Sequence, residues 1–208
     1  MINYSKLSQH TGAQVDGIDL AQPLDRQIAR ALYDIFTDHC VLLFRDQTLT
    51  QQQLIAASAN FGTVAEYVRP ADLRSETQKK VPAQIMLITN IREDGKPVGA
   101  LPDGEMWFHH DMIHAPQPHK ATLLYSVQIP DHGGNTCFSN LFAAYEALPD
   151  HLKEKLEGRM AINAFNYGSR FKGDPEGLAR SGCPPRHRDP SRYWQKSALC
   201  GPVDDPGD

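Results

Sequence analysis

Several features that mark other classes of protein are missing from this sequence of 208 residues. It has no excess of basic residues, because 21 Lys and Arg stand against 25 Asp and Glu and give a formal net charge of -4, whereas a nucleic-acid-binding face is usually basic. No apolar run approaches the roughly 18 residues of a membrane span. Residues 1–14 lack the basic-then-apolar layout of a signal peptide. We therefore expect a cytoplasmic protein with no nucleic-acid or membrane partner.

Cysteine pairs are missing as well. The four cysteines are scattered and none forms a C-x-x-C pair, so neither a zinc knuckle nor a redox dithiol is indicated. We expect four free, structural thiols, namely Cys40, Cys137, Cys183 and Cys200.

What is present is typical of one globular domain, with 40% hydrophobic and 22% charged residues. Asp25 can cap a helix whose apolar residues continue to Phe36, and Thr50 can cap a second helix that Gly62 closes. The other segments of this half follow from composition and from glycine and proline positions. They are predicted strands at Val41–Phe44 and Ile85–Ile91, and predicted loops at Arg69–Val81 and Arg92–Gly104.

The middle of the chain predicts the fold class. From Ala121 to Ile129 apolar and polar residues alternate, except at Leu124, as in a half-buried strand of an antiparallel sheet. Asp131–Gly134 then forms a turn, and Thr136–Phe138 starts a returning strand. Two short helices follow, at Leu141–Leu148 and Pro149–Leu156. This order predicts a mainly β fold with flanking helices, an antiparallel barrel or jelly roll.

Residues 107–114, Trp-Phe-His-His-Asp-Met-Ile-His, concentrate three histidines and a carboxylate. On a strand, His109 and Asp111 would point to one side and His110 to the other. An imidazole and a carboxylate are two of the three ligands of a facial triad, which leaves positions on Fe(II) open. On a helix, His110 and His114 would form the competing pair, as in zinc proteases, but the H-E-x-x-H glutamate is absent. The nearby prolines favour the strand.

Over residues 10–182 the chain resembles the taurine and dichlorophenoxyacetate dioxygenase family, the Fe(II)- and 2-oxoglutarate-dependent dioxygenases. Several spaced motifs carry the resemblance in the family's order, which is far more specific than any one of them. They are Gly12–Leu20, His39–Gln47 (HCVLLFRDQ), Trp107–Asp111, which is similar to a W-H-x-D metal motif, Pro130–Thr136, which is similar to a P-x-x-G-G-x-T turn, and Asn140–Pro149.

The resemblance implies a double-stranded β-helix, or jelly roll, that uses Fe(II) with 2-oxoglutarate as co-substrate. It makes His109 and Asp111 iron ligands, and Thr136 the residue that hydrogen-bonds the co-substrate carboxylate through its hydroxyl. The implied reaction hydroxylates a small organic substrate and releases succinate and CO₂. We expect a small-molecule substrate and leave a homo-oligomer open.

The family also needs a distal iron-binding histidine and an arginine for the far carboxylate of the co-substrate. After Gly158 the only histidine is His187, whose surroundings do not resemble the distal motif, and we do not assign it. We therefore expect a partial jelly-roll domain at residues 1–182, incomplete at its C-terminus, and a non-family tail at 183–208.

The tail itself predicts a change of reading frame. Residues 193–196, Tyr-Trp-Gln-Lys, must be encoded as TAY TGG CAR AAR, and a reading one base later gives Thr or Ile, then Gly, then Arg or Lys. Extended over residues 184–208, the shifted reading permits HPVIGTHPVTGRKALYVGRLMTRV, which resembles the segment that these dioxygenases carry next. The tail is therefore interpreted as an out-of-frame product after about Gly182, and we expect this chain to be inactive.

Two alternatives belong to other classes. One is a non-catalytic jelly-roll fragment with weak or no metal binding. The other is a cupin-like zinc or small-molecule binder, which would need a third histidine on the same face. Succinate release coupled to 2-oxoglutarate distinguishes the dioxygenase from both.

Overall fold

The structure is a computed structural model. It describes residues 2–66, 74–100, 108–113, 118–157, 159, 162–165 and 179–182. These residues belong to two compact units, of which the first takes residues 1–108 and 123–137 and the second residues 109–122 and 138–208. The predicted tail, 183–208, lies outside the described residues, so its separation from the domain stays a prediction.

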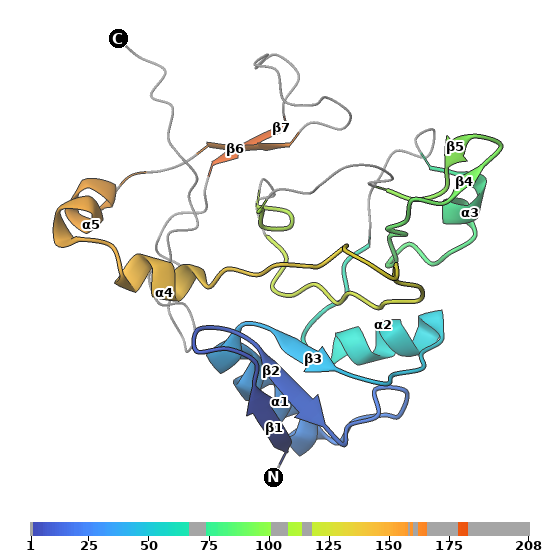
Figure 1. Cartoon of the computed structure of the whole chain (residues 1–208), viewed down its shortest axis with the longest axis horizontal. Coiled ribbons are helices and arrows are strands. Elements are labelled where there is room, and N and C mark those ends of the chain that lie inside the picture. Colours follow the sequence, from blue (N-terminus) through green and yellow to red (C-terminus); the bar gives the residue numbers. More distant parts are fainter. Residues whose placement is uncertain are drawn as a thin grey trace. The chain divides into compact units, whose positions relative to one another are not determined.

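The first unit is built on a three-stranded mixed sheet (Figure 1). Strand β1 (Asn3–Lys6) pairs antiparallel with β2 (Ala13–Asp16), and β2 pairs parallel with β3 (Leu42–Phe44), so that Ala13 lies opposite Leu42. Because β2 is central, its alternate side chains Ala13 and Val15 are buried, whereas the whole of the edge strand β1 is exposed.

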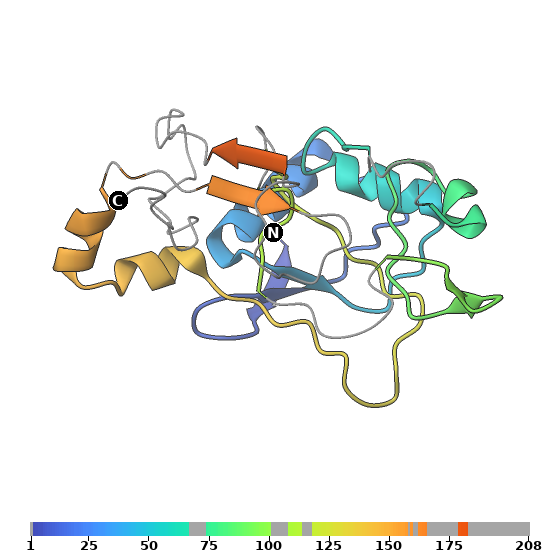
Figure 2. The ribbon, with the colours of Figure 1, turned by 90° about the horizontal axis from the view of Figure 1, so that it is seen from above.

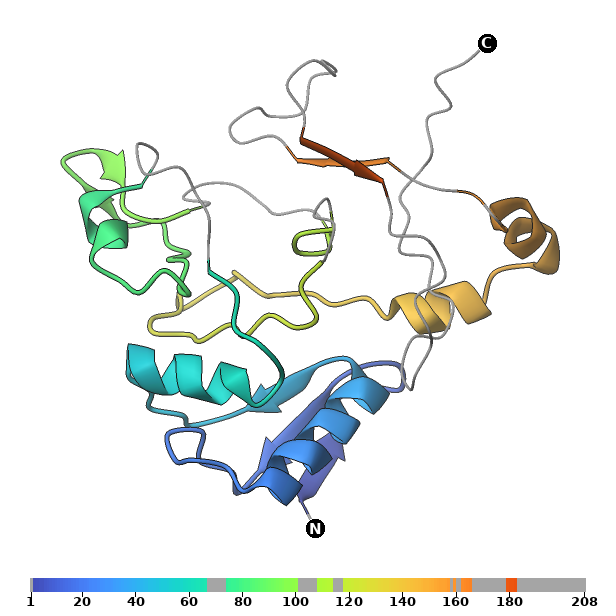
Figure 3. The ribbon, with the colours of Figure 1, turned by 180° about the vertical axis from the view of Figure 1, so that it is seen from behind.

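Helix α1 (Arg26–His39) supplies the crossover that a parallel pair requires, and it lies against one face of the sheet (Figure 3). The Asp25 side chain accepts a hydrogen bond from the Gln27 N–H at its start. Cys40 ends the helix in the left-handed conformation, with φ of 64°, and its N–H donates to the Phe36 carbonyl. Leu32 is fully buried. The predicted helix and the predicted strand at 41–44 are confirmed, although β3 is half-buried.

The amide of Gln47 joins two turns of this unit. Its Nε2 donates to the carbonyls of Ile18 (3.0 Å) and Arg45 (2.9 Å), and its Oε1 accepts from the Leu20 N–H (2.8 Å). Helix α2 (Gln51–Ala59) begins just beyond it, with the predicted Thr50 cap in a capping box with Gln53.

Residues 74–100 contain two elements that the sequence analysis assigned to loops. Helix α3 (Glu76–Lys79) begins at the Ser75 cap, and β4 (Arg92–Glu93) forms a hairpin with β5 (Lys96–Pro97). Both carry local signals that were missed. Ser75 and Gln78 have capping-box spacing, and Asp94–Gly95, with φ of 50° and 74°, is a typical hairpin turn.

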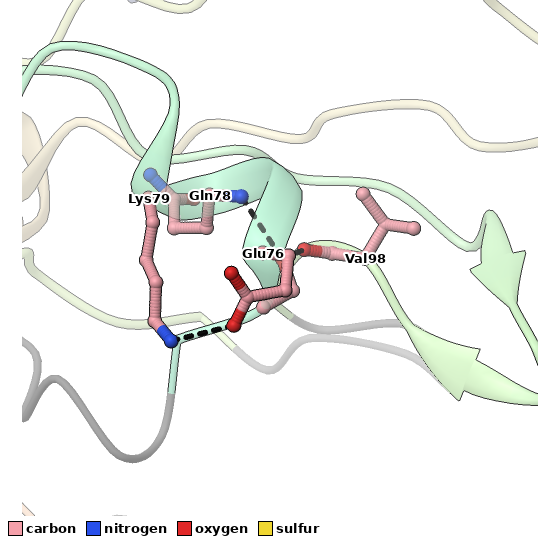
Figure 4. A network of polar contacts seen from close by, with 5 residues as sticks. Glu76, Gln78, Lys79 and Val98 are labelled. Atoms are coloured by element: carbon pink, nitrogen blue, oxygen red, sulfur yellow. Dashed lines mark hydrogen bonds and ion pairs between the residues drawn. The ribbon is translucent and has the colours of Figure 1, made fainter.

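Polar contacts hold α3 in place (Figure 4). The Gln78 side chain, 7% exposed, donates to the Ile85 carbonyl and accepts from the Leu87 N–H, both at 2.9 Å. The Ser75 hydroxyl donates to the carbonyl of buried Val98. At the surface, the hydrogen bond and charge of Lys79 lower the pKa of the Glu76 carboxyl.

Three predicted strands are wrong. Ile85–Ile91 has only one bridge, between Ile88 and Ala100, and neither Ala121–Ile129 nor Thr136–Phe138 is a strand. A strand requires a neighbour for its backbone hydrogen bonds, and no described strand pairs with these segments.

Half-buried and exposed side chains nevertheless alternate, as predicted, in part of residues 121–129. Leu123 and Tyr125 are half-buried, and the Tyr125 hydroxyl accepts a hydrogen bond from the Leu49 N–H at 3.1 Å. Val127 and Ile129, predicted on the same face, are 87% and 73% exposed. The described part of the molecule therefore leaves one end of this segment uncovered.

In the second unit, α4 (Leu141–Glu146) and α5 (Asp150–Leu156) confirm both predicted helices. The Asn140 side chain caps α4. Strands β6 (Ile162–Phe165) and β7 (Ala179–Gly182), which were not predicted, run antiparallel (Figure 2). The described sheets have three, two and two strands, so the described residues do not by themselves form the predicted jelly roll. In the described residues no helix is long and apolar enough to cross a membrane.

We expect Gln47→Ala to lower the free energy of unfolding by about 1–3 kcal/mol, because it removes the partners of half-buried backbone groups. Urea unfolding of the full chain, followed by circular dichroism, measures this loss. Gln51→Ala, at an exposed position of α2, is the control and should change the value by less than about 0.5 kcal/mol. Equal midpoints for the two variants would contradict a role for the Gln47 amide.

Candidate metal and co-substrate site

The segment predicted to bind metal is a turn. Phe108 is 73% exposed, and residues 111–113 form a turn that the Ile113 N–H closes onto the His110 carbonyl at 3.3 Å. Met112 has a left-handed φ of 55°. The predicted strand is therefore wrong, and the described part of the segment is not helical either. Trp107 and His114 lie outside the described residues, so the competing pair of His110 and His114 is not described.

The side chains of the two predicted ligands nevertheless lie close together. His109 Nε2 lies 3.2 Å from Asp111 Oδ1, and the two side chains are 52% and 43% exposed. His110 is turned to another partner, since its Nδ1 lies 2.9 Å from the backbone carbonyl of Asp111. The predicted juxtaposition of His109 and Asp111 is confirmed, although the segment does not form the predicted strand.

A residue that the sequence analysis missed completes this cluster. The Thr122 hydroxyl donates to Asp111 Oδ2 at 2.6 Å, within the range of an O–H···O⁻ bond. The two residues are 11 apart in the sequence, so no local spacing rule connects them. Thr122 lies on the polar, exposed face of the predicted strand. A threonine there is expected only to contact solvent.

The donor set of the pair fits a divalent metal ion. Metal–nitrogen and metal–oxygen bonds of about 2.0–2.2 Å place two ligands at adjacent coordination positions roughly 3 Å apart, close to the observed 3.2 Å. Imidazole and carboxylate are also two of the three groups of the facial triad. In the described residues no group of three or more His, Cys, Asp or Glu could hold a metal. The pair therefore offers two donor atoms of the kinds that a metal ion uses, and His187 lies outside the described residues.

Thr136, predicted to bind the co-substrate, belongs to the first unit, where it is exposed and outside any helix or strand. The glycine turn before it is present, with φ of 76° at Gly133 and 68° at Gly134. A Cβ at Gly134 would approach Pro130 Cγ to 3.1 Å, so both conformation and space favour glycine there. The His109–Asp111 pair belongs to the second unit, so the assignment of Thr136 stays a prediction.

The two described cysteines are free, as predicted. Burial raises the pKa of the Cys40 thiol, which favours its protonated form. Cys137 is exposed. Cys183 and Cys200 lie outside the described residues.

Comparison with known proteins identifies the family of these residues. The family described as "Taurine catabolism dioxygenase TauD, TfdA family" matches residues 3–197. An alpha-ketoglutarate-dependent 2,4-dichlorophenoxyacetate dioxygenase of Cupriavidus pinatubonensis is 32% identical over 167 residues, which are 76% of this chain and 56% of the relative. An (S)-phenoxypropionate/alpha-ketoglutarate-dioxygenase of Sphingobium herbicidovorans is 28% identical over 164 residues, which are 78% and 52% of the two chains. The chain thus spans about half the length of these relatives.

Comparison with solved structures agrees with this family match. A taurine dioxygenase from Burkholderia xenovorans superposes with a TM-score of 0.60 at 29% identity, over 79% of this chain and 54% of that chain. A protein named AAD-2, in complex with Mn(II) and N-oxalylglycine, superposes with a TM-score of 0.59 at 24% identity, over 88% and 62% of the two chains, which shows likeness of fold alone. The neighbours are taurine-dioxygenase-type proteins, whose fold is a jelly roll.

We expect Asp111→Ala to weaken Mn(II) binding by the full chain at least about 10-fold. Removing a residue that only hydrogen-bonds a metal ligand already weakens binding by about this factor. The loss of the free Mn(II) signal in electron paramagnetic resonance titrations measures the Kd. His110→Ala is the matched control, because its ring contacts a backbone carbonyl, and should stay within about 2-fold of the parent. A larger loss in His110→Ala than in Asp111→Ala would contradict the assignment.

Proposed function

The chain belongs to the TauD, TfdA family of dioxygenases, and we propose that its activity is the hydroxylation of a small organic substrate coupled to 2-oxoglutarate, with Fe(II) as the metal. The reaction consumes dioxygen. One oxygen atom enters a C–H bond of the substrate as a hydroxyl, and the other enters succinate as 2-oxoglutarate loses CO₂. The relatives named for dichlorophenoxyacetate and phenoxypropionate support a small organic substrate.

One observation carries the proposal, the 3.2 Å approach of His109 Nε2 to Asp111 Oδ1 within the W-x-H-x-D segment. The two residues are two apart in the sequence, and their side chains meet although the segment is not a strand. Here a turn with a left-handed residue at Met112 follows the pair, and both atoms are donors that a divalent ion uses. The coincidence of family motif and geometry is what favours a metal pair over an ordinary surface contact.

The side chains have separate tasks in this proposal. His109 and Asp111 hold the ion, and the negative charge of Asp111 offsets part of the ion's charge. Thr136 donates its hydroxyl to a carboxylate of 2-oxoglutarate and orients it. Fe(II), when bound, supplies the redox chemistry with dioxygen that no protein side chain offers.

We also propose that the chain as printed is a catalytically incomplete form. Two observations support this. Among the described residues no group of three or more His, Cys, Asp or Glu side chains could hold a metal ion. Large apolar side chains are exposed between residues 124 and 138, namely Leu124, Val127, Ile129 and Phe138. Restoring the reading frame past Gly182 would supply the distal histidine and arginine.

A non-catalytic fragment is the second candidate, and the absence of a group of three or more metal donors among the described residues favours it. It differs from an incomplete enzyme in one respect, because restoring the frame would not make it active. The two candidates are therefore separated by comparing two lengths of the same chain.

We expect the 208-residue chain to form little or no succinate, and the frame-restored chain to turn over 2-oxoglutarate. The assay contains Fe(II), ascorbate and 2-oxoglutarate, with succinate quantified by chromatography. His109→Ala in the frame-restored chain is the control for metal-dependent turnover and should remove it. Robust turnover by the short chain would show that the site is already complete and would make His187 the first residue to replace.

We expect Thr136→Val in the frame-restored chain to raise the KM for 2-oxoglutarate roughly 10- to 100-fold, with a smaller change in kcat. The lost bond is a hydrogen bond to a charged group, which contributes about 1.5–3 kcal/mol to binding. Thr136→Ser, which keeps the hydroxyl, should recover most of the affinity. An unchanged KM in Thr136→Val would remove Thr136 from the site.

A further inference from the structure

The two oxygens of the Asp111 carboxylate have different partners. Oδ1 lies 3.2 Å from His109 Nε2, and Oδ2 accepts a hydrogen bond of 2.6 Å from the Thr122 hydroxyl. All three residues belong to the second unit. The carboxylate is therefore held from one side by a hydroxyl while its other oxygen faces the imidazole.

We propose that Thr122 is a positioning residue that makes Asp111 a ligand through one oxygen and keeps that oxygen beside His109. This inference rests on the proposed function, because it concerns the same pair of ligands. Thr122 itself does not contact the ion or the substrates in this proposal. It acts through Asp111.

The argument depends on the freedom of an aspartate side chain. A carboxylate can bind a metal through one oxygen or through both, and it can rotate about its last bond. A facial triad must leave coordination positions open, and a carboxylate that binds through both oxygens occupies one of them. A hydroxyl that donates to Oδ2 engages that oxygen and restrains the rotation.

Distance and position agree with this role. The 2.6 Å separation lies in the range of hydrogen bonds between a hydroxyl and a carboxylate anion, which are stronger than neutral ones. Thr122 also comes from a different part of the chain, 11 residues beyond Asp111, so the bond restrains the carboxylate against a second segment.

The test uses Co(II), whose visible absorption reports both affinity and ligand geometry, added to the full 208-residue chain. Thr122→Val removes the hydroxyl at nearly constant volume, and Thr122→Ser keeps it. Thr77→Val is the matched control. The Thr77 hydroxyl also donates to an exposed carboxylate, that of Glu93 at 3.0 and 3.1 Å, in the first unit.

We expect Thr122→Val to weaken Co(II) binding roughly 10- to 100-fold, the usual effect of removing a partner of a metal ligand, and to change the absorption spectrum at saturation. Thr122→Ser should stay within about 3-fold of the parent, and Thr77→Val should not differ from it. Urea unfolding without metal, measured on the same samples, separates loss of folded protein from loss of affinity.

Parent affinity and an unchanged spectrum in Thr122→Val would overturn the inference. An affinity loss that only follows the loss of folded protein would overturn it too, because Thr122 would then be structural. If Thr122→Val does not fold, Thr122→Ala replaces it under the same criteria. If the parent chain shows no Co(II) binding that Asp111→Ala reduces, the result would overturn the proposed metal pair instead.

Discussion

Parallel pairing of β2 with β3 is the constraint on which the first unit depends. Parallel neighbours cannot be joined by a tight turn, so the chain must leave the sheet after Asp16, cross one face as α1 and return at Leu42. Leu32 of this helix is fully buried, and the crossover fixes where the chain emerges beyond Phe44. The Gln47 amide then ties the exit to the Ile18–Leu20 turn. The family motif at residues 39–47 therefore has a structural role, because it contains the end of α1, the parallel strand β3 and the Gln47 side chain.

The candidate site obeys a different constraint, because it depends on a turn. In a strand, residues two apart share a side, but their backbones lie roughly 6–7 Å apart along the chain. The ligand atoms at adjacent positions of one ion lie closer than this, so the two side chains would have to lean toward each other. In the structure this segment is not a strand, His109 Nε2 lies 3.2 Å from Asp111 Oδ1, and the His110 ring lies beside a backbone carbonyl. Thr122 then restrains the second carboxylate oxygen. The chemistry of the cluster thus comes from one local turn and one contact from 11 residues away.

Prediction from the sequence was most successful where local signals decide the structure. The caps at Asp25 and Thr50, with apolar residues at helical spacing, predicted two helices that the structure confirms. The short helices predicted at 141–148 and 149–156 are present as well. Two local signals were present and overlooked, the capping-box spacing of Ser75 and Gln78 and the Asp94–Gly95 hairpin turn. Prediction failed at residues 121–129, where alternation was correctly recognised but strand pairing needs a partner that no local pattern guarantees.

The sequence by itself determined the family and the absence of any cysteine motif, and it predicts His109 and Asp111 as ligands, because residue types and their spacing are sufficient for each. Only the tertiary structure decided that the His109 and Asp111 side chains meet outside a strand, that His110 has a separate partner and that Thr122 bonds Asp111. Backbone reversal and contacts across 11 residues depend on how distant segments satisfy each other's hydrogen bonds, and that information is not contained in any short stretch of sequence.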